Sequence, residues 1–271
     1  MPFTFSHPAA VLPALRTDAE GALRARGRLV AAGLIAGSIA PDIPFFAESI
    51  VPGVYGHGRI AHAAAGVAVL DPLLAAGLVT GWALVREPVV ALLPPSAQSR
   101  AATLLAIGST CDGHRPAATA RSAGWFWVSA VAGAASHVGV DAFTHAGRWG
   151  TRHLPLLQRA VHGAPLYDWA QCATSAAGLA ALAVHGTRAV CDTPHTAPPP
   201  RLPRLTRRAR RTGAAVLAST ALAGAALRHR QDRPRTAASL IASLTFGAGT
   251  GLALGAASVA AAVRAGERRN R

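Results

Sequence analysis

The stretch SHVGVDAFTH at residues 136–145 decides how the rest of the chain is interpreted. It closes a strongly apolar run that begins at Gly124 and that is typical of a membrane helix. Residues four apart stack on one face of a helix, which places His137, Asp141 and His145 in a single file. Ionisable groups are costly in hydrocarbon and are kept there when something pairs with them. The three side chains therefore either share a divalent cation or hydrogen-bond to one another.

The composition of the 271-residue chain indicates an integral membrane protein. Hydrophobic residues make up 51% of it, the mean hydropathy is +0.30 and 14% of the residues are charged, whereas a soluble domain has about 25%. The formal net charge is +15, and all 27 basic residues are Arg. They cluster between apolar runs, as the positive-inside rule predicts. The basic charge therefore predicts contact with the lipid bilayer and its anionic headgroups, and no nucleic-acid partner.

The apolar runs predict an all-α, polytopic membrane protein with about five to six transmembrane helices. They lie at residues 29–40, 63–85, 124–144, 166–187, 212–227 and 236–263. The first run is short for a crossing of about 20 residues, so the chain over 29–47 either crosses the membrane or re-enters on the same side. We expect a membrane domain at 1–190, a Pro/Arg-rich linker at 191–211, and two further Ala/Gly-rich helices with a basic tail at 212–271. The small residues of these two helices predict close contact between helices.

The distribution of Arg residues predicts the orientation in a bacterial plasma (inner) membrane. Nineteen of the 27 Arg residues fall in segments 1–28, 86–123, 188–211 and 264–271, which we therefore expect on the cytoplasmic side. Four Arg residues at 228–235 do not suit the outer side that this topology gives them. Apart from this, the topology brings the ends of several helices with His or Asp to the outer face. Only the N-terminal His7 is left on the other side, unless the first apolar segment is re-entrant.

Histidine and aspartate residues near these helix ends and in the N-terminal segment are the candidate metal ligands: His7, Asp42, His62, His137, Asp141 and His145. Imidazoles with carboxylates suit Zn²⁺, and also Mn²⁺ or Fe²⁺, whereas an all-oxygen set suits Mg²⁺ or Ca²⁺. Asp141 and Asp42 are the candidate catalytic residues, each either as a ligand or as a general base. Asp71, beside Pro72, is expected to hydrogen-bond a neighbouring helix, and the isolated run at 111–114 (CDGH) is not expected to join the site.

Four motifs resemble a known family. The opening MPFTFSHPA at 1–9, GSIAPD at 37–42, the spacing of His57 and His62, and the stretch at 136–145 are similar to a bacterial membrane family of unknown function whose members open with MPFTxSHPA. That family in turn resembles the inner-membrane metal-dependent hydrolases, whose pattern is an N-terminal His, a PD, an HRGxTHS and an HxxxD. The resemblance covers roughly residues 1–190, and no counterpart is evident for the last two helices.

The resemblance implies a ligand set and a fold. It places the N-terminal His on His7, the PD on residues 41–42, the two histidines of HRGxTHS on His57 and His62, and HxxxD on His137 and Asp141. This chain departs from the pattern at HGRIAHA (57–63), where Arg and Gly are exchanged and Ala63 replaces Ser. The implied fold is similar to that of zinc-dependent phospholipase C.

Two functions of different classes are compatible with these observations. The first is a membrane-bound metal-dependent hydrolase, with zinc as the expected metal and a phosphoester or lipid-linked molecule as the expected substrate. The second is a non-enzymatic multi-pass protein, a scaffold or a small-solute transporter, in which the buried His and Asp residues are structural. A transporter typically has internal repeats or paired broken helices, and the sequence contains no convincing repeat.

Overall fold

The computed structural model describes residues 4–19, 22–106, 116–193, 202–234 and 236–269, which are mostly helical. The first part of the chain contains the 3₁₀ helix η1 (Thr4–Ala14), strands β1 (Leu15–Thr17) and β2 (Leu23–Ala25), helix α1 (Ala31–Gly37), η2 (Ala40–Asp42), α2 (Ile43–Ala47), η3 (Val54–His57) and α3 (Gly58–Ala61). The π-helical turn η4 (Gly66–Leu70) follows and continues directly into α4 (Asp71–Val90), after which comes α5 (Pro95–Leu104).

The second part contains the long helices. They are α6 (Pro116–Thr144), α9 (Leu166–Asp192), α10 (Arg207–Asp232) and α11 (Ala237–Arg269), with the short α7 (Trp149–His153), α8 (Pro155–Gln158), β3 (Ala160–Val161) and β4 (Ala164–Pro165) between α6 and α9. The strands form two separate antiparallel pairs, β1 with β2 and β3 with β4. The described residues are thus an all-α fold with two small hairpins.

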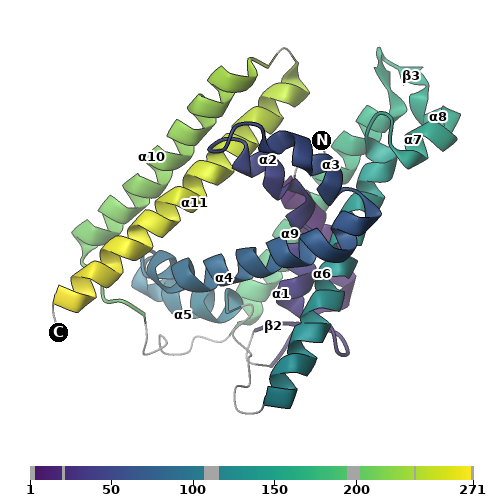
Figure 1. Cartoon of the computed structure of the whole chain (residues 1–271). Coiled ribbons are helices and arrows are strands. Elements are labelled where there is room, and N and C mark those ends of the chain that lie inside the picture. The colour runs from purple at the N-terminus through teal and green to yellow at the C-terminus, as the bar shows by residue number, and fades with distance from the viewer. Residues whose placement is uncertain (1–3, 20–21, 107–115, 194–201, 235, 270–271) are drawn as a thin grey trace.

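Helices α1, α4, α6 and α9 gather in one body, and η1 lies along α9 and α6 (Figure 1). Helices α10 and α11 form an antiparallel hairpin beside this body and reach it through α2 at one end and α4 at the other (Figure 1). The β3–β4 hairpin with α7 and α8 stands at the far end of α6 (Figure 1). The N-terminal segment therefore lies among helices that are distant from it in sequence.

A close crossing of α1 and α6 sets the position of the residues that follow α1. A Cβ atom on Gly37 would lie 2.2 Å from the carbonyl oxygen of Ala130, and one on Gly133 would lie 2.3 Å from that of Leu34. Small residues of this kind let two backbones approach directly. Because the two helices touch through their backbones, Ser38 at the end of α1 lies beside Gly133, four residues before His137 in α6.

Glycines also let α10 and α11 approach each other closely within their hairpin. A Cβ atom on Gly224 would lie 2.2 Å from the carbonyl oxygen of Gly247, and one on Gly251 would lie 1.9 Å from that of Thr220. The hydroxyl of Thr206 caps α10 by accepting a hydrogen bond from the amide of Ala209 at 3.1 Å. The Ala/Gly-rich composition that predicted close helix contact is thus realised between these two helices.

Two helices in the described part of the chain are long and apolar enough to cross a membrane, Gly66–Val90 and Ala238–Arg269. The expected number was five to six, and the other expected segments are helical without meeting this criterion. The apolar helix at Ala31–Ala47 is too short, and α10 carries an Arg-rich run at each end. The expected apolar segments are thus helical, but only two of the described helices meet the criterion for a membrane span.

The expected linker at 191–211 is partly helical. Helix α9 continues to Asp192, and residues 207–211 already form the first turns of α10, while residues 194–201 lie outside the described ranges. Arg228, which the topology had placed in an outer loop, is instead a buried residue of α10. This removes one of the four charges that did not suit that loop.

Candidate metal centre

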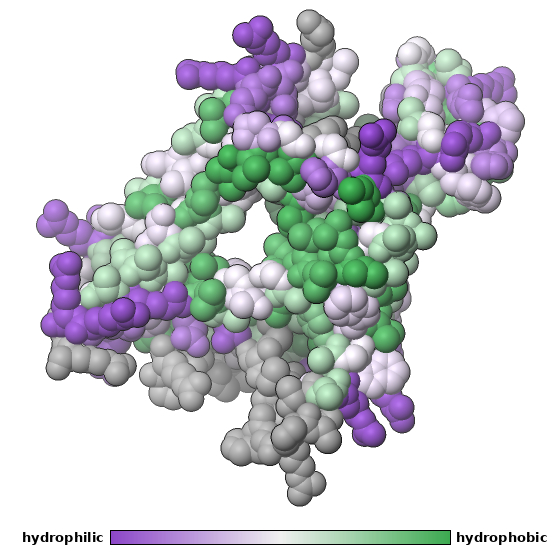
Figure 2. Space-filling view, in the orientation of Figure 1, coloured by the Kyte–Doolittle hydropathy of each residue, from purple (hydrophilic) through white to green (hydrophobic). Residues whose placement is uncertain are grey.

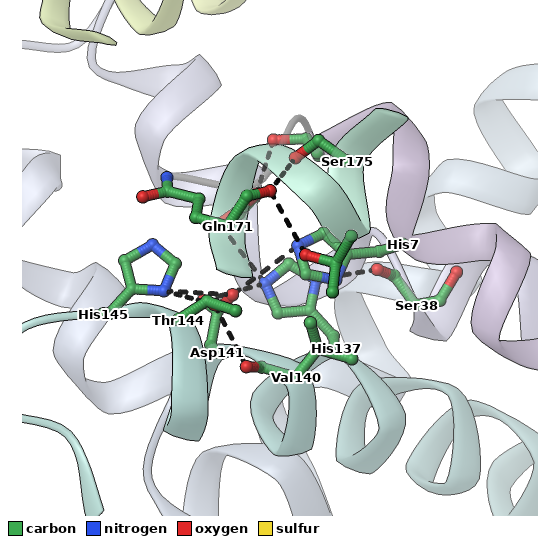
Figure 3. Close-up of polar contacts among 12 residues, drawn as sticks. His7, Ser38, His137, Val140, Asp141, Thr144, His145, Gln171 and Ser175 are labelled. Carbon is green, nitrogen blue, oxygen red and sulfur yellow. Dashed lines mark hydrogen bonds and ion pairs between the residues drawn. The ribbon is translucent and has the colours of Figure 1, made fainter. Parts of the chain in front are cut away.

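Two residues of the stretch at 136–145 are buried near the end of α6. His137 is fully buried and Asp141 is 3% exposed, and the Nε2 atom of His137 lies 3.5 Å from Oδ2 of Asp141, one helical turn away. The ring of His137 is fixed by its other nitrogen, because Nδ1–H donates a hydrogen bond of 2.8 Å to the carbonyl oxygen of Ser38 (Figure 3). The close crossing of α1 and α6 makes this bond available. It leaves the Nε2 atom of His137 directed at the carboxylates.

Asp42 approaches the same point from the other side. It ends the 3₁₀ turn Ala40–Asp42, and its Oδ1 atom lies 3.5 Å from Nε2 of His137. Its other oxygen accepts a hydrogen bond of 2.5 Å from the hydroxyl of Thr4. Thr4 therefore orients the Asp42 carboxylate, so that one oxygen is satisfied by the protein and the other faces the histidines.

His62 is held in the same way as His137. It follows the last residue of α3, and its Nδ1–H donates a hydrogen bond of 2.7 Å to the carbonyl oxygen of Gly58. Its Nε2 atom lies 3.3 Å from Oδ2 of Asp141 and 3.8 Å from Oδ1 of Asp42. Histidines that bind metals usually donate their second ring N–H to a carbonyl or carboxylate, which fixes the tautomer and the ring orientation. His62 and His137 both have this arrangement.

His7 enters the cluster from η1. Its ring stacks on that of His137, with centroids 3.6 Å apart, and its Nε2 atom lies 3.6 Å from Oδ1 of Asp141 (Figure 3). η1 can approach α9 closely because Gly178 has no side chain; a Cβ atom there would lie 2.9 Å from the carbonyl oxygen of Ser6. Burial, helped by the neighbouring His137, lowers the pKa of His7 to about 4. His7 is thus a neutral imidazole at neutral pH, although simple topology had placed it on the opposite side from the other ligands.

The distances in the cluster match the spacing of ligands around an ion better than they match hydrogen bonds. The N···O separations among these five residues are 3.3–3.8 Å, whereas N–H···O bonds are about 2.7–3.2 Å. Zinc bonds of about 2.0–2.1 Å in a tetrahedron place neighbouring ligand atoms about 3.3–3.4 Å apart. Two groups have ligand atoms within 4.8 Å of one another: His7, Asp42 and His137, and also His62, His137 and Asp141.

Several atoms that face the centre have no hydrogen-bond partner among the described residues. They are Nε2 of His7, Nε2 of His137, Oδ1 of Asp42 and Oδ1 of Asp141. Buried polar atoms normally find a partner, because an unpaired one costs about 1–3 kcal/mol. Unpaired nitrogen and oxygen atoms that converge on one point have the chemistry of a cation site.

His145 lies at the edge of the centre. Its Nδ1 atom is 3.3 Å from Oδ1 of Asp141 and 3.1 Å from the hydroxyl of Thr144 (Figure 3). Its side chain is 19% exposed, against 4% for that of Asp141. Burial lowers the pKa of His145. His145 belongs to neither of the two groups of ligand atoms, and it connects Asp141 with the less buried side of the site.

Other candidates lie apart from the cluster. His57 is exposed at the end of η3 and belongs to neither group of ligand atoms. Asp71 is fully buried, but neither of its carboxylate oxygens has a hydrogen-bond partner among the described residues, so the expected bond to a neighbouring helix is not found. The run at 111–114 lies outside the described residues.

Sequence reasoning did not identify the groups that orient the ligands. The carbonyls of Ser38 and Gly58 carry no side-chain signal, because any residue offers a backbone carbonyl. Thr4 was detectable in principle, since it precedes His7 within the MPFTFSHPA opening, but its partner Asp42 is 38 residues away. These contacts depend on the tertiary fold.

The fold and the centre define the chain as a helical protein with a buried three-histidine, two-aspartate cluster and two helices suited to a membrane. A family model described as Domain of unknown function (DUF4184) matches residues 1–261, and the chain belongs to this family. The match includes α10 and most of α11, which the sequence resemblance had left without a counterpart. No curated protein and no solved structure matches the chain.

Proposed function

We propose that the protein is a membrane-bound metal-dependent hydrolase. Its proposed substrate is a phosphoester or lipid-linked molecule at the membrane surface. The observation that carries the proposal is the paired arrangement of His62 and His137. Each donates Nδ1–H to a backbone carbonyl and directs Nε2 at the carboxylates of Asp42 and Asp141. This is how proteins prepare imidazoles as metal ligands.

Charge balance supports a divalent ion. Asp42 and Asp141 are buried carboxylates, and His7 is neutral at neutral pH. An isolated buried charge is strongly unfavourable, so two carboxylates need positive charge close by. In the metal-free site a protonated His137 balances only one of the two carboxylates, and its 3.5 Å separations from both are long for the hydrogen bonds that an imidazolium makes. A divalent cation balances both carboxylates at the observed spacing.

The mixed donor set favours zinc, with Mn²⁺ or Fe²⁺ as alternatives. His7, Asp42, His62, His137 and Asp141 are the residues that would hold the ion. A bound divalent ion supplies Lewis acidity and lowers the pKa of a water molecule to near neutrality. Hydrolysis of an ester by that water is the chemistry that such a site supports.

Asp141 is the better candidate for the general base. Its Oδ1 atom lies 3.3 Å from Nδ1 of His145, whose side chain is the more exposed of the two. A proton taken by Asp141 could therefore pass to His145 and leave the buried site. Asp42 is the better candidate for a ligand alone, because its second oxygen is occupied by Thr4.

The proposed location is a bacterial inner membrane, with several passes. Large apolar side chains stand exposed on α4 and α11, among them Leu73, Leu84, Leu252 and Leu254. In Figure 2 hydrophobic residues lie in the middle of the visible surface, with hydrophilic residues above them and at the lower left and lower right. Hydrocarbon would cover such a surface, and the Arg residues would meet anionic headgroups. A substrate at this location is expected to be lipid-linked.

The burial of the centre favours one alternative, a non-enzymatic multi-pass protein such as a scaffold or small-solute transporter whose cluster is structural. None of the five residues is more than 7% exposed. A structural site is closed, whereas a catalytic site keeps one position open. The two functions differ in whether the protein catalyses hydrolysis.

The test is metal analysis of protein purified in detergent without chelators, followed by assays on a panel of phosphomonoesters and phosphodiesters. We expect Zn²⁺ or a similar ion at up to one equivalent and slow hydrolysis. His137→Ala should lose the ion, and Asp141→Asn should lose activity while the helix still inserts. His153→Ala, on an exposed histidine outside the cluster, is the matched control. Metal-free wild-type protein without hydrolysis would refute the proposal and favour the non-enzymatic alternative, and bound metal without hydrolysis would refute the enzymatic activity.

A further inference from the structure

The α10–α11 hairpin is attached to the main body at the carboxyl end of α2, the helix that directly follows Asp42. Arg228 of α10 is 3% exposed, and its Nη1 atom donates to the carbonyl oxygen of Phe45 at 3.1 Å and to the hydroxyl of Ser49 at 3.4 Å. Its Nε atom donates to Asp232 at 2.7 Å. A cation at the carboxyl end of a helix is favourable, because the last carbonyls have no partner in the helix.

The second helix of the hairpin binds the neighbouring residue of α2. The hydroxyl of Thr250 lies 2.7 Å from the carbonyl oxygen of Phe46. The ring of Phe246 meets that of Phe46 edge-on, with centroids 4.9 Å apart, and lies 5.7 Å from that of Phe45. A five-residue helix has no stability of its own, so α2 depends on its neighbours, which are η3, α3 and η2 in the main body and α11 of the hairpin.

Phe45 connects this attachment to the metal centre. Its ring lies 5.8 Å from that of His62 and fills the space beside Gly58, where a Cβ atom would lie 2.2 Å from Cε1 of Phe45. The carbonyl of Gly58 is the group that fixes Nδ1 of His62. The Phe45 ring therefore packs against both Gly58 and His62.

We infer that Arg228 is a positioning residue for the metal centre, acting through Phe45 on His62. The inference rests on the proposed metal binding. His137 has a separate support, the carbonyl of Ser38, which does not involve the hairpin. Loss of Arg228 should therefore disturb His62 and leave His137 in place.

The test uses the full chain in detergent with Arg228→Met, Arg228→Lys and the matched control Arg230→Met, since Arg230 is exposed on the same helix. On chelator-treated protein, diethyl pyrocarbonate reports how accessible each histidine is. Zn²⁺ affinity is measured separately by competition with a chromogenic chelator. Arg228→Met should make His62 reactive while His137 stays protected. It should also weaken Zn²⁺ binding about tenfold, the lower end of the range for losing a group that orients a metal ligand. Arg228→Lys should fall between wild type and Arg228→Met.

Thr250→Val provides a second route to the same result, because it removes the other hydrogen bond to α2 without removing a buried charge. Equal protection of His62 in Arg228→Met and Arg230→Met would overturn the inference. So would simultaneous exposure of His62 and His137, since that indicates general loosening of the fold. If wild-type protein takes up no Zn²⁺, the proposed function fails, and the accessibility of His62 alone then decides whether Arg228 positions it.

Discussion

The close crossing of α1 and α6 can be tested by adding a single methyl group at Gly133. Its Cβ atom would lie 2.3 Å from the carbonyl oxygen of Leu34 and 2.8 Å from the amide nitrogen of Ser38. An ordinary non-bonded contact is about 3.5 Å, so Gly133→Ala must move α1 away from α6 by about 1 Å. Overpacking of this kind costs about 1–3 kcal/mol.

The same displacement should reach the metal centre. The hydrogen bond from His137 to Ser38 is 2.8 Å long, and a movement of about 1 Å would stretch it beyond the range of a hydrogen bond. Losing a contact that orients a ligand typically weakens metal binding by about 10–100-fold, which corresponds to about 1.4–2.8 kcal/mol. Gly133→Ala should therefore weaken Zn²⁺ binding by that factor and also lower the thermal stability.

The assay is a chelator competition with Zn²⁺ together with a thermal unfolding curve, both in detergent. Gly139→Ala is the matched control, because Gly139 lies on the same helix and a Cβ atom there meets nothing within 4 Å. It should leave binding unchanged. Wild-type affinity in Gly133→Ala would show that the hydrogen bond from His137 to Ser38 of α1 does not orient His137 for metal binding.

Two further predictions concern Gly58 and His7. Gly58→Ala should displace the Phe45 ring and with it His62, so it should weaken Zn²⁺ binding and lower the free energy of unfolding by about 1–3 kcal/mol. Gly56→Ala is the control, because a Cβ atom there meets nothing within 4 Å. Equal Zn²⁺ binding by the two variants would contradict the role of Phe45. The lowered pKa of His7 means that, between about pH 6.5 and about pH 4, the unfolded chain binds a proton that the folded chain does not. The metal-free protein should therefore lose up to about 3 kcal/mol of stability as the pH falls through this window. His7→Gln should remove that part of the pH dependence in unfolding curves, and an unchanged dependence would count against a buried neutral His7.

The sequence was most informative where one helix carries the signal by itself. The spacing of His137 and Asp141 requires only helical geometry to place both on one face, and the structure has them one turn apart. The Ala/Gly-rich composition of the last two segments similarly predicted close contact, which Gly224 and Gly247 make. The number of membrane spans was less well determined, because apolar composition alone does not separate a helix that crosses a membrane from one that packs in a helical body.

Asp71 and His57 show where local reasoning fails. Nine residues of regular helix would place Asp71 half a turn from His62, but the chain has a turn after His62 and a π-helical turn at Gly66–Leu70. The angular relation between the two residues is therefore not fixed by their spacing. His57 and His62 are five residues apart, yet one is exposed and the other buried, because η3 ends and α3 begins between them.

By itself, the sequence determined the helical class, the candidate ligands and the family-like motifs, since these depend on residue type and short spacing. Only the tertiary structure decided which of these candidate ligands meet. His7, Asp42 and His137 are separated by long stretches of chain and come together through backbone contacts at glycines. The carbonyls of Ser38 and Gly58 then orient the two imidazoles. A backbone carbonyl is the same chemical group at every residue, so only the fold can give it a partner.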